Sequence, residues 1–333
     1  MEEIIGNRET LALLYGAAKS EKPAGCYIIA GAEGSGKRSI ARLAAAAFCC
    51  VSRHPDGSPC LTCRNCRNIL SGTHVDVREL NPEKDKKWIP VEDVRQFLKV
   101  TYLAPVEGDW RAYLIDASAL NTQGQNALLK SIEEVRPRSV FFLMATDLSA
   151  LLPTVRSRSV ILKTEALSSD IICGALQKEA GNRAKYAERI PVAAALSRGS
   201  LGMARKLLHS DRFFSTRATV LSYFDTILSG GGFIKLCAVA PPGAMNRQEY
   251  IDFLTMARTC LRDLLRRKND PGAAPLIFPD EELFSDLATV IHLRRGVELF
   301  DLTEELLANA DNANVFTGLS RYHRGMQGLT KNE

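Results

Sequence analysis

The chain has 333 residues, of which 46% are hydrophobic and 24% charged, and it contains no low-complexity tract. This length allows about two or three domains, and the composition is typical of a folded globular protein and excludes a largely disordered one. The net charge of +5 is mild, and basic residues are scattered among acidic ones. Charge therefore permits contact with nucleic acid without arguing for it.

The N-terminal stretch MEEIIGNRET has two acidic residues before any apolar run, unlike a signal peptide. The longest apolar run, LAAAAFCCV, is far shorter than the roughly 20 residues that cross a bilayer. We therefore expect a cytoplasmic protein with no membrane partner.

The first half of the chain alternates expected strands with expected helices. A helix is expected at 8–20 and a buried strand at 26–31, followed by a glycine-rich turn and a helix. Further strands are expected at 74–80, 111–116, 139–146 and 159–164, with helices between them. Short β-branched runs that alternate with helices predict an α/β domain with a mainly parallel sheet covered on both faces.

The strand pattern stops after Thr164, and only helical periodicity follows. Short amphipathic segments are expected to about residue 210, and longer helices separated by Gly/Pro loops after it. We therefore expect an α/β + all-α protein with an α/β domain at 1–165, a small helical domain at 166–210 and a helical domain at 211–333.

The turn after the first strand matches the phosphate-binding pattern G-x-x-x-x-G-K. Its glycines, Gly31, Gly34 and Gly36, would let backbone N–H groups wrap phosphates, and Lys37 would reach the β- and γ-phosphates. The alternative is a glycine turn with a chance lysine. The strand before it and the helix after it favour the phosphate-binding interpretation.

Groups that hydrolysis needs are missing from this first domain. The hydroxyl that usually holds Mg²⁺ after the lysine is replaced by Arg38, and Ser39 would point about 100° further around the helix. Asp116 ends a strand where it could bind the metal, or it is an ordinary strand-end carboxylate. The next residue is Ala117 in place of a water-positioning glutamate, so hydrolysis should be severely impaired.

Cys60, Cys63 and Cys66 run C-x₂-C-x₂-C, with Cys50 ahead of them. Four thiolates at such spacing suit a tetrahedral structural Zn²⁺. An iron–sulfur cluster is the rival, but the x₃-C-P continuation of the ferredoxin run is absent. A histidine, His54 or His74, in place of Cys50 is a minor alternative.

The segments IIGNRETLALL, GAEGSGKRSIARLAAAAFCC, CLTCRNC, GTHVDV, VEDVRQF, NALLKSIEE and RSRS together resemble the clamp-loader branch of AAA+ proteins over residues 4–210. The resemblance implies a RecA-like domain, a helical lid and a collar through which five subunits form a ring in bacterial DNA polymerase III. Its implied partners are the gamma/tau ATPase subunits, the delta subunit and, through the complex, the sliding clamp and primed DNA. It also implies a zinc module, inserted at 50–66, whose first ligand matches Cys50.

The same resemblance assigns roles to further residues. The ATPase subunits of this branch carry a lid arginine where this chain has Gly202, whereas Thr146 matches the polar residue that senses the γ-phosphate. Ser157, Arg158 and Ser159 match the motif that offers an arginine to the neighbouring subunit's ATP, with Arg156 as a second candidate. Both arginines could also be ordinary solvated charges.

We therefore expect a ring member that does not hydrolyse ATP, that braces the loader and that presents Arg158 in trans, with ATP or ADP bound weakly or vestigially. One alternative is an active clamp-loader ATPase, which the intact phosphate loop and Asp116 favour. A recombination or repair AAA+ enzyme fits the fold but explains neither the cysteine insert nor RSRS.

Overall fold

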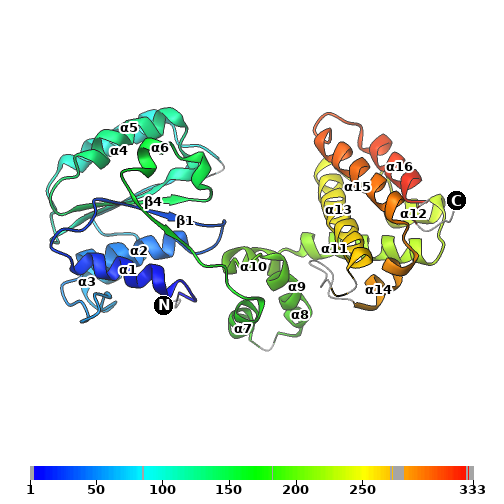
Figure 1. The fold of residues 1–333 in the computed structure, drawn as a ribbon, viewed down its shortest axis with the longest axis horizontal. Helices are drawn as coiled ribbons and strands as arrows, with labels where there is room; N and C mark the ends of the chain where they lie inside the picture. Colours follow the sequence, from blue (N-terminus) through cyan, green and yellow to red (C-terminus); the bar gives the residue numbers. More distant parts are fainter. Residues whose placement is uncertain are drawn as a thin grey trace. The chain divides into compact units, whose positions relative to one another are not determined.

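The computed structural model describes residues 4–84, 86–181, 183–270, 272, 281–327 and 329, without the side chains of 281–285. The chain divides into two compact units (Figure 1): Met1–Ser168 with Gly199–Met203, and Ser169–Arg198 with Ala204–Glu333. The three-domain boundaries expected from the sequence stay a prediction, and their outer ends, 1–3 and 330–333, lie outside the described residues.

All described strands lie in the first unit and form one parallel sheet in the order β2-β3-β4-β1-β5. Because every strand runs the same way, the carboxyl ends of β1, β3 and β4 meet at one edge, where ligands bind in open α/β sheets. The strands are β1 (Cys26–Ala30), β2 (Val77–Leu80), β3 (Arg111–Asp116), β4 (Ser139–Ala145) and β5 (Val160–Lys163).

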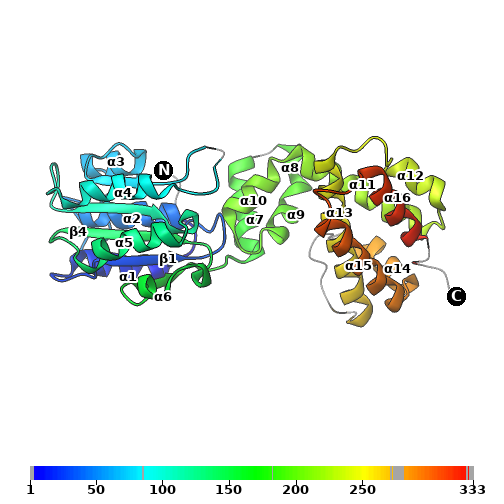
Figure 2. The ribbon, with the colours of Figure 1, turned by 90° about the horizontal axis from the view of Figure 1, so that it is seen from above.

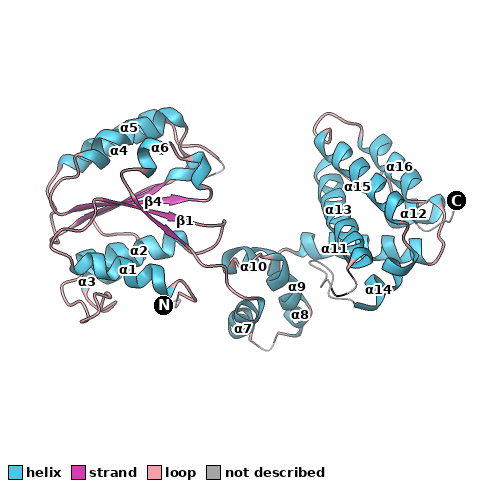
Figure 3. Cartoon of the chain, in the orientation of Figure 1, coloured by secondary structure: helices cyan, strands magenta, loops and turns pink. Residues whose placement is uncertain are grey.

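Helices cover both faces of this sheet, since the central strands are buried throughout and alternate their side chains between two cores. Tyr27 and Ile29 face one core, whereas Cys26 and Ile28 face the other. Figures 1 and 3 show α1, α2 and α3 on one side and α4, α5 and α6 on the other. Their bounds are α1 (Arg8–Lys19), α2 (Lys37–Cys49), α3 (Arg64–Ser71), α4 (Val91–Lys99), α5 (Thr122–Glu133) and α6 (Pro153–Arg156), with 3₁₀ turns η1 (Val100–Tyr102), η2 (Ala117–Ala119) and η3 (Leu148–Ala150).

A buried ion pair anchors the start of β3. The Asp76 carboxylate is fully buried and accepts hydrogen bonds from Arg111 at 3.0 Å and from the backbone N–H groups of Val106, Glu107 and Gly108. Burial raises the pKa of Asp76, but these donors together hold it below its ordinary value. The carboxylate therefore fixes the loop before β3 to the end of the segment before β2.

The second unit is helical wherever it is described, so the predicted fold class, an α/β sheet followed by helices, is confirmed. Figure 2 shows α7, α8 and α9 gathered together, and α11 to α16 share one core around Tyr223, Tyr250 and Phe253. None of the described helices is both long and apolar enough to cross a membrane. Their bounds are α7 (Ser169–Ala180), α8 (Ala184–Ala187), α9 (Arg189–Leu196), α10 (Leu201–Leu208), α11 (Asp211–Leu228), α12 (Phe233–Val239), α13 (Arg247–Asn269), α14 (Glu281–Val290), α15 (Leu293–Ala308) and α16 (Val315–Met326).

A histidine is built into the core of the second unit. His323 is fully buried, and its Nδ1 lies 2.6 Å from the hydroxyl of Tyr223 while its Nε2 lies 2.9 Å from the carbonyl oxygen of Ala240. A neutral ring satisfies both contacts when Nε2–H donates to the carbonyl and Nδ1 accepts from the tyrosine. Burial lowers the pKa of His323, in keeping with that neutral state.

Candidate nucleotide loop, arginine and cysteine cluster

The glycine-rich loop joins the carboxyl end of β1 to the first turn of α2, at the sheet edge where ligands bind. Gly34 has φ +73° and Gly36 has φ +89°, conformations that residues with a Cβ rarely adopt. A Cβ built on Gly36 would meet no atom within 4 Å, so the space beside this residue is open. The loop therefore has the backbone shape that the motif requires.

Lys37 folds back onto this loop. Its Nζ donates to the carbonyl oxygens of Gly31 and Ala32, at 2.8 Å in each case. Burial lowers the pKa of Lys37, while the carboxylates of Asp116 and Glu33 act in the opposite direction. Lys37 and Asp116 thus lie close enough to interact across the sheet edge, as a nucleotide site would need.

Arg38 points away from that site and joins a polar chain at the end of β2. Its guanidinium lies 2.5 Å from the Asn81 side-chain oxygen, Asn81 donates to Glu79 at 3.3 Å, and Glu79 pairs with Arg42 at 2.5 Å. The Ser39 side chain is exposed, and its hydroxyl has no hydrogen-bond partner within the described part of the chain. Arg38 therefore offers no hydroxyl beside Lys37, and the nucleotide-binding role of Ser39 stays a prediction.

The ends of β3 and β4 are joined by a serine that the sequence interpretation did not single out. Ser118 donates its backbone N–H to Asp116 at 3.2 Å, and its hydroxyl accepts the backbone N–H of Thr146 at 2.8 Å and lies 3.1 Å from the Thr146 hydroxyl. Ala117, between Asp116 and Ser118, is buried, and its side chain offers no polar group. Asp116 and Thr146 are thus brought to one place, and no glutamate stands at position 117 beside them.

The start of α10 lies directly against the glycine-rich loop. Gly202 donates its N–H to the carbonyl oxygen of Gly34 at 3.0 Å, and the Ser200 hydroxyl donates to the carbonyl of Glu33 at 2.7 Å. A Cβ on Gly202 would lie 2.8 Å from both the Cα and the carbonyl oxygen of Gly34. The sequence identified Gly202 only as a missing arginine, whereas the structure gives it a packing reason.

Arg158 lies just after α6 and is exposed, with 40% of its side chain accessible. Its Nε lies 2.6 Å from Glu133 at the end of α5, and its Nη1 donates to the carbonyl of Thr154 at 3.1 Å. Arg156 is half-buried, and its Nε has no hydrogen-bond partner among the described residues. Of the two arginine candidates, Arg158 is the more exposed to solvent or to another molecule.

Four cysteine sulfurs gather between the end of α2 and the start of α3. The Sγ atoms of Cys50, Cys60, Cys63 and Cys66 all lie within 4.8 Å of one another. Tetrahedral zinc with bonds of about 2.3 Å separates its sulfurs by about 3.8 Å, close to the 4.0 Å between Cys50 and Cys63. This cluster could bind a metal ion.

Backbone donors around the cluster support thiolates. Cys60, Cys63 and Cys66 each direct a backbone N–H at the sulfur of Cys50, Cys60 and Cys63 respectively, at 3.3–3.4 Å. The N–H of Cys63 is the main cause that lowers the pKa of Cys60 to about 6, whereas burial raises that of Cys50 and Cys66. Burial disfavours the charged thiolates of Cys50 and Cys66. A bound metal cation would offset that cost, because a coordinating thiol is deprotonated.

The neighbours of the cluster do not belong to it. Cys49 is buried, donates its thiol to the carbonyl of Trp110 at 3.3 Å, and has its pKa raised by burial to about 12. His74 is buried, and its Nδ1 accepts the backbone N–H of Asp76. Among the described residues neither His74 nor His54 lies within the group of candidate ligand atoms.

Comparison with known proteins relates the first half of the chain to one family. A family model described as "DNA polymerase III, delta subunit" matches residues 6–168. A DNA polymerase III subunit delta' from Pseudomonas aeruginosa is 34% identical over 207 residues, which are 61% of this chain and 61% of that protein. Residues 6–168, just under half of the chain, therefore match the clamp-loader family of AAA+ proteins.

Other clamp-loader relatives carry a different subunit name. DNA polymerase III subunit tau of Bacillus subtilis is 26% identical over 81% of this chain and 47% of its own length. Subunit tau/gamma of Haemophilus influenzae is 34% identical over 50% of this chain and 24% of its own length. The chain therefore spans less than two thirds of each curated relative, and its exact place among clamp-loader subunits is a matter for proposal.

Proposed function

We propose that this chain is a ring member of the bacterial DNA polymerase III clamp loader, of the delta-prime kind, that hydrolyses no ATP and presents Arg158 to the ATP site of an adjacent ATPase subunit. The observation that carries the proposal is a contrast within the first unit. Arg158 is exposed and anchored, whereas the chain's own loop has Arg38, Ala117 and Gly202 where hydrolysis needs other groups.

The chain's own loop supports weak or vestigial binding of ATP or ADP. The glycine conformations and Lys37 suit phosphates, and Asp116 and Thr146 lie at the same edge of the sheet. Ser39 offers a hydroxyl to a metal, but it lies one residue further along α2 than such sites use. These groups favour nucleotide binding without hydrolysis.

The arginine acts by electrostatics. A guanidinium held beside a γ-phosphate stabilises the negative charge that develops during transfer, an effect of about 10³–10⁵ in rate where an arginine is supplied in trans. Gamma/tau ATPase subunits would receive Arg158, with the delta subunit completing a ring through the helical region at 211–333. Through that ring the chain would act on the sliding clamp and primed DNA.

We further propose that Cys50, Cys60, Cys63 and Cys66 hold one structural Zn²⁺. Their sulfur separations and backbone N–H donors fit a closed tetrahedral site, which leaves no position open for substrate. When bound, zinc would tie the end of α2 to the start of α3. Its contribution is therefore to folding of this segment and not to ATP chemistry.

The experiment that tests the proposal reconstitutes the chain with its ATPase and delta partners and measures ATP turnover stimulated by clamp and primed DNA. Arg158→Ala should lower turnover while the ring still assembles. Arg136→Ala, an exposed arginine elsewhere in the first unit, is the matched control and should leave turnover unchanged. A loss with Arg156→Ala instead would transfer the role to the second candidate.

An active ATPase is the second candidate function. The open space beside Gly36 and the similarity to tau/gamma subunits favour it. Turnover by the purified chain alone distinguishes the two, because only an active ATPase would show substantial turnover that Lys37→Ala abolishes.

A further inference from the structure

The guanidinium of Arg158 is held by groups of its own chain on two of its three nitrogens. Nε lies 2.6 Å from Oε1 of Glu133, and Nη1 donates to the carbonyl of Thr154 at 3.1 Å and to the hydroxyl of Ser157 at 3.3 Å. Nη2 has no hydrogen-bond or ion-pair partner within the part of the chain that the structure describes. The side chain is therefore oriented, yet one nitrogen remains available to an outside oxygen.

The two anchors come from different elements. Thr154 lies in the short helix α6, and its carbonyl oxygen accepts from the Ser157 hydroxyl as well as from Arg158. Glu133 is the last residue of α5, where Ser131 and Ile132 are buried and fix the position of the helix end. The direction of the guanidinium is thus set by two segments of a packed unit and not by its own exposed stem alone.

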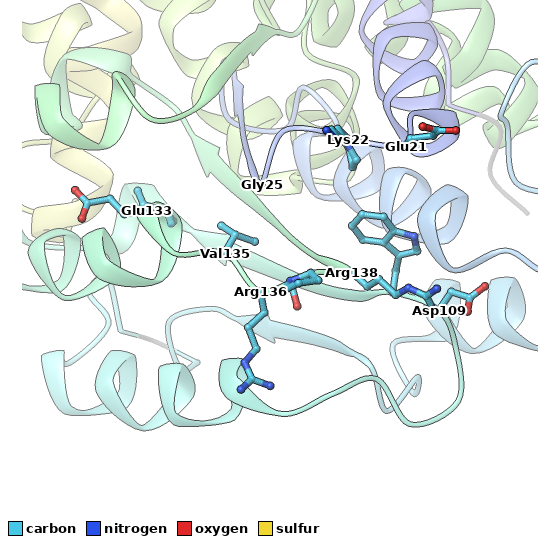
Figure 4. A pocket seen from close by; sticks show the side chains of 13 residues that line it. Glu21, Lys22, Gly25, Asp109, Glu133, Val135, Arg136 and Arg138 are labelled. Carbon is cyan, nitrogen blue, oxygen red and sulfur yellow. Dashed lines mark hydrogen bonds and ion pairs between the residues drawn. The ribbon is translucent and has the colours of Figure 1, made fainter.

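Glu133 pairs with Arg158 although other cations are near. It lines a pocket together with Lys22, Asp109, Arg136 and Arg138, in which Arg138 pairs with Asp109 at 3.1 Å (Figure 4). Figure 4 shows the Glu133 side chain directed away from those of Lys22 and Arg136. Among the described residues Glu133 forms its ion pair with Arg158 alone.

We propose that Glu133 is a positioning residue for Arg158, acting through the ion pair between its carboxylate and Nε, 2.6 Å apart. This inference rests on the proposed function, in which Arg158 acts on a neighbouring subunit's ATP. An exposed ion pair of this kind contributes little to folding stability, since 40% and 44% of the two side chains are accessible. Its contribution here is to fix the arginine before the partner arrives, which lowers the entropy lost on forming the transition state.

A carboxylate beside the arginine could also slow the reaction, and the experiment distinguishes this effect from positioning. A carboxylate that competes with phosphate for the guanidinium would slow the reaction, and either removing or neutralising it would raise turnover. Orientation by the ion pair predicts instead that removing or neutralising the carboxylate lowers turnover. Glu133→Ala and Glu133→Gln therefore separate the two roles.

The experiment uses the full chain in the reconstituted loader and measures kcat and KM for ATP with clamp and primed DNA. Glu134→Ala is the matched control, because Glu134 is the adjacent exposed glutamate and forms no ion pair within the described residues. We expect Glu133→Ala to lower kcat by about 3- to 30-fold, bounded by the rotamer entropy of a free arginine side chain, with KM unchanged. Glu133→Gln should lower kcat by a similar factor, because it removes the charge of the ion pair, and Glu134→Ala should equal wild type.

Each of the remaining possible results overturns one specific claim. If Arg158→Ala lowers turnover but Glu133→Ala leaves it unchanged or raises it, the positioning role is wrong and the proposed function stands. A Glu133→Gln variant as fast as wild type would remove the ion-pair role. If Arg158→Ala itself has no effect, the proposed function fails and this inference fails with it. Thermal unfolding and ring assembly of each variant separate all of these from a failure to fold.

Discussion

Replacing Gly202 by alanine tests whether the start of α10 is held on the nucleotide loop by direct backbone contact. The added methyl group would lie 2.8 Å from both the Cα and the carbonyl oxygen of Gly34, and 3.2 Å from its carbonyl carbon. None of these atoms belongs to a flexible side chain that could turn aside. The segment Gly199–Met203 must therefore move off the loop, or the loop must move.

The size of the effect follows from three contributions. Overpacking of this kind costs about 1–3 kcal/mol, and the hydrogen bond from Gly202 to Gly34 contributes about 1 kcal/mol more. In a helix, replacing glycine by alanine stabilises the fold by about 0.5–1 kcal/mol, which offsets part of this cost. We therefore expect a net destabilisation of about 1–3 kcal/mol, either of the whole unit or of the docked segment alone.

Hydrogen exchange of the amide at position 202 measures a local destabilisation, and thermal unfolding measures a global one. A local cost of about 1.4 kcal/mol accelerates exchange about tenfold, whereas a global one lowers Tm by roughly 2–4 °C per kcal/mol. Gly16→Ala is the matched control, since Gly16 lies in α1 of the same unit and a Cβ there would meet nothing within 4 Å. It should stabilise the protein by about 0.5–1 kcal/mol. A Gly202→Ala variant that is stabilised like Gly16→Ala, with unchanged exchange, would refute the reasoning.

Further predictions concern the metal, the pH dependence and the buried ion pair. Cys63→Ser should lower bound zinc from about one ion per chain to near zero, whereas Cys49→Ala should keep it, because only Cys63 belongs to the sulfur cluster; elemental analysis of the untagged protein decides this. Burial lowers the folded-state pKa of His323, so the unfolded chain binds a proton that the folded chain excludes; stability is fully present above about pH 6.5 and falls as pH decreases below it. His323→Gln should flatten that fall in urea unfolding series, and an identical slope would count against the neutral histidine. Asp76→Ala should cost about 3–5 kcal/mol, because it leaves the buried guanidinium of Arg111 unpaired; a change below about 1 kcal/mol would contradict the structural role.

Local patterns made the parallel sheet predictable. The central strands are short buried runs of β-branched and aromatic residues, so their parallel pairing follows from alternation with helices, whereas the strand order β2-β3-β4-β1-β5 was not predicted. Gly34 and Gly36 are required by the left-handed backbone of one loop, a constraint contained within a few residues. The x₂ spacings of Cys60, Cys63 and Cys66 likewise bring sulfurs together through local turns.

Contacts between distant segments could not be predicted in this way. The approach of Gly202 to Gly34 and the pairing of Glu133 with Arg158 depend on how whole elements pack, which no local pattern encodes. Arg38 illustrates the same limit, because the sequence identified a missing hydroxyl but gave no sign of its partner Asn81. Ser118 was overlooked since a serine after Asp-Ala has no distinctive spacing, although its hydroxyl joins the ends of β3 and β4.

The central claim is that this chain supplies an arginine to another subunit's ATP while its own loop performs no chemistry. The most direct measurement compares Arg158→Ala with Lys37→Ala in the same reconstituted loader, by ATP turnover at the site that this chain faces. The account predicts that Arg158→Ala lowers turnover there by about 10³-fold or more, with the ring intact, and that Lys37→Ala leaves it unchanged. A loss of turnover with Lys37→Ala and none with Arg158→Ala would contradict it.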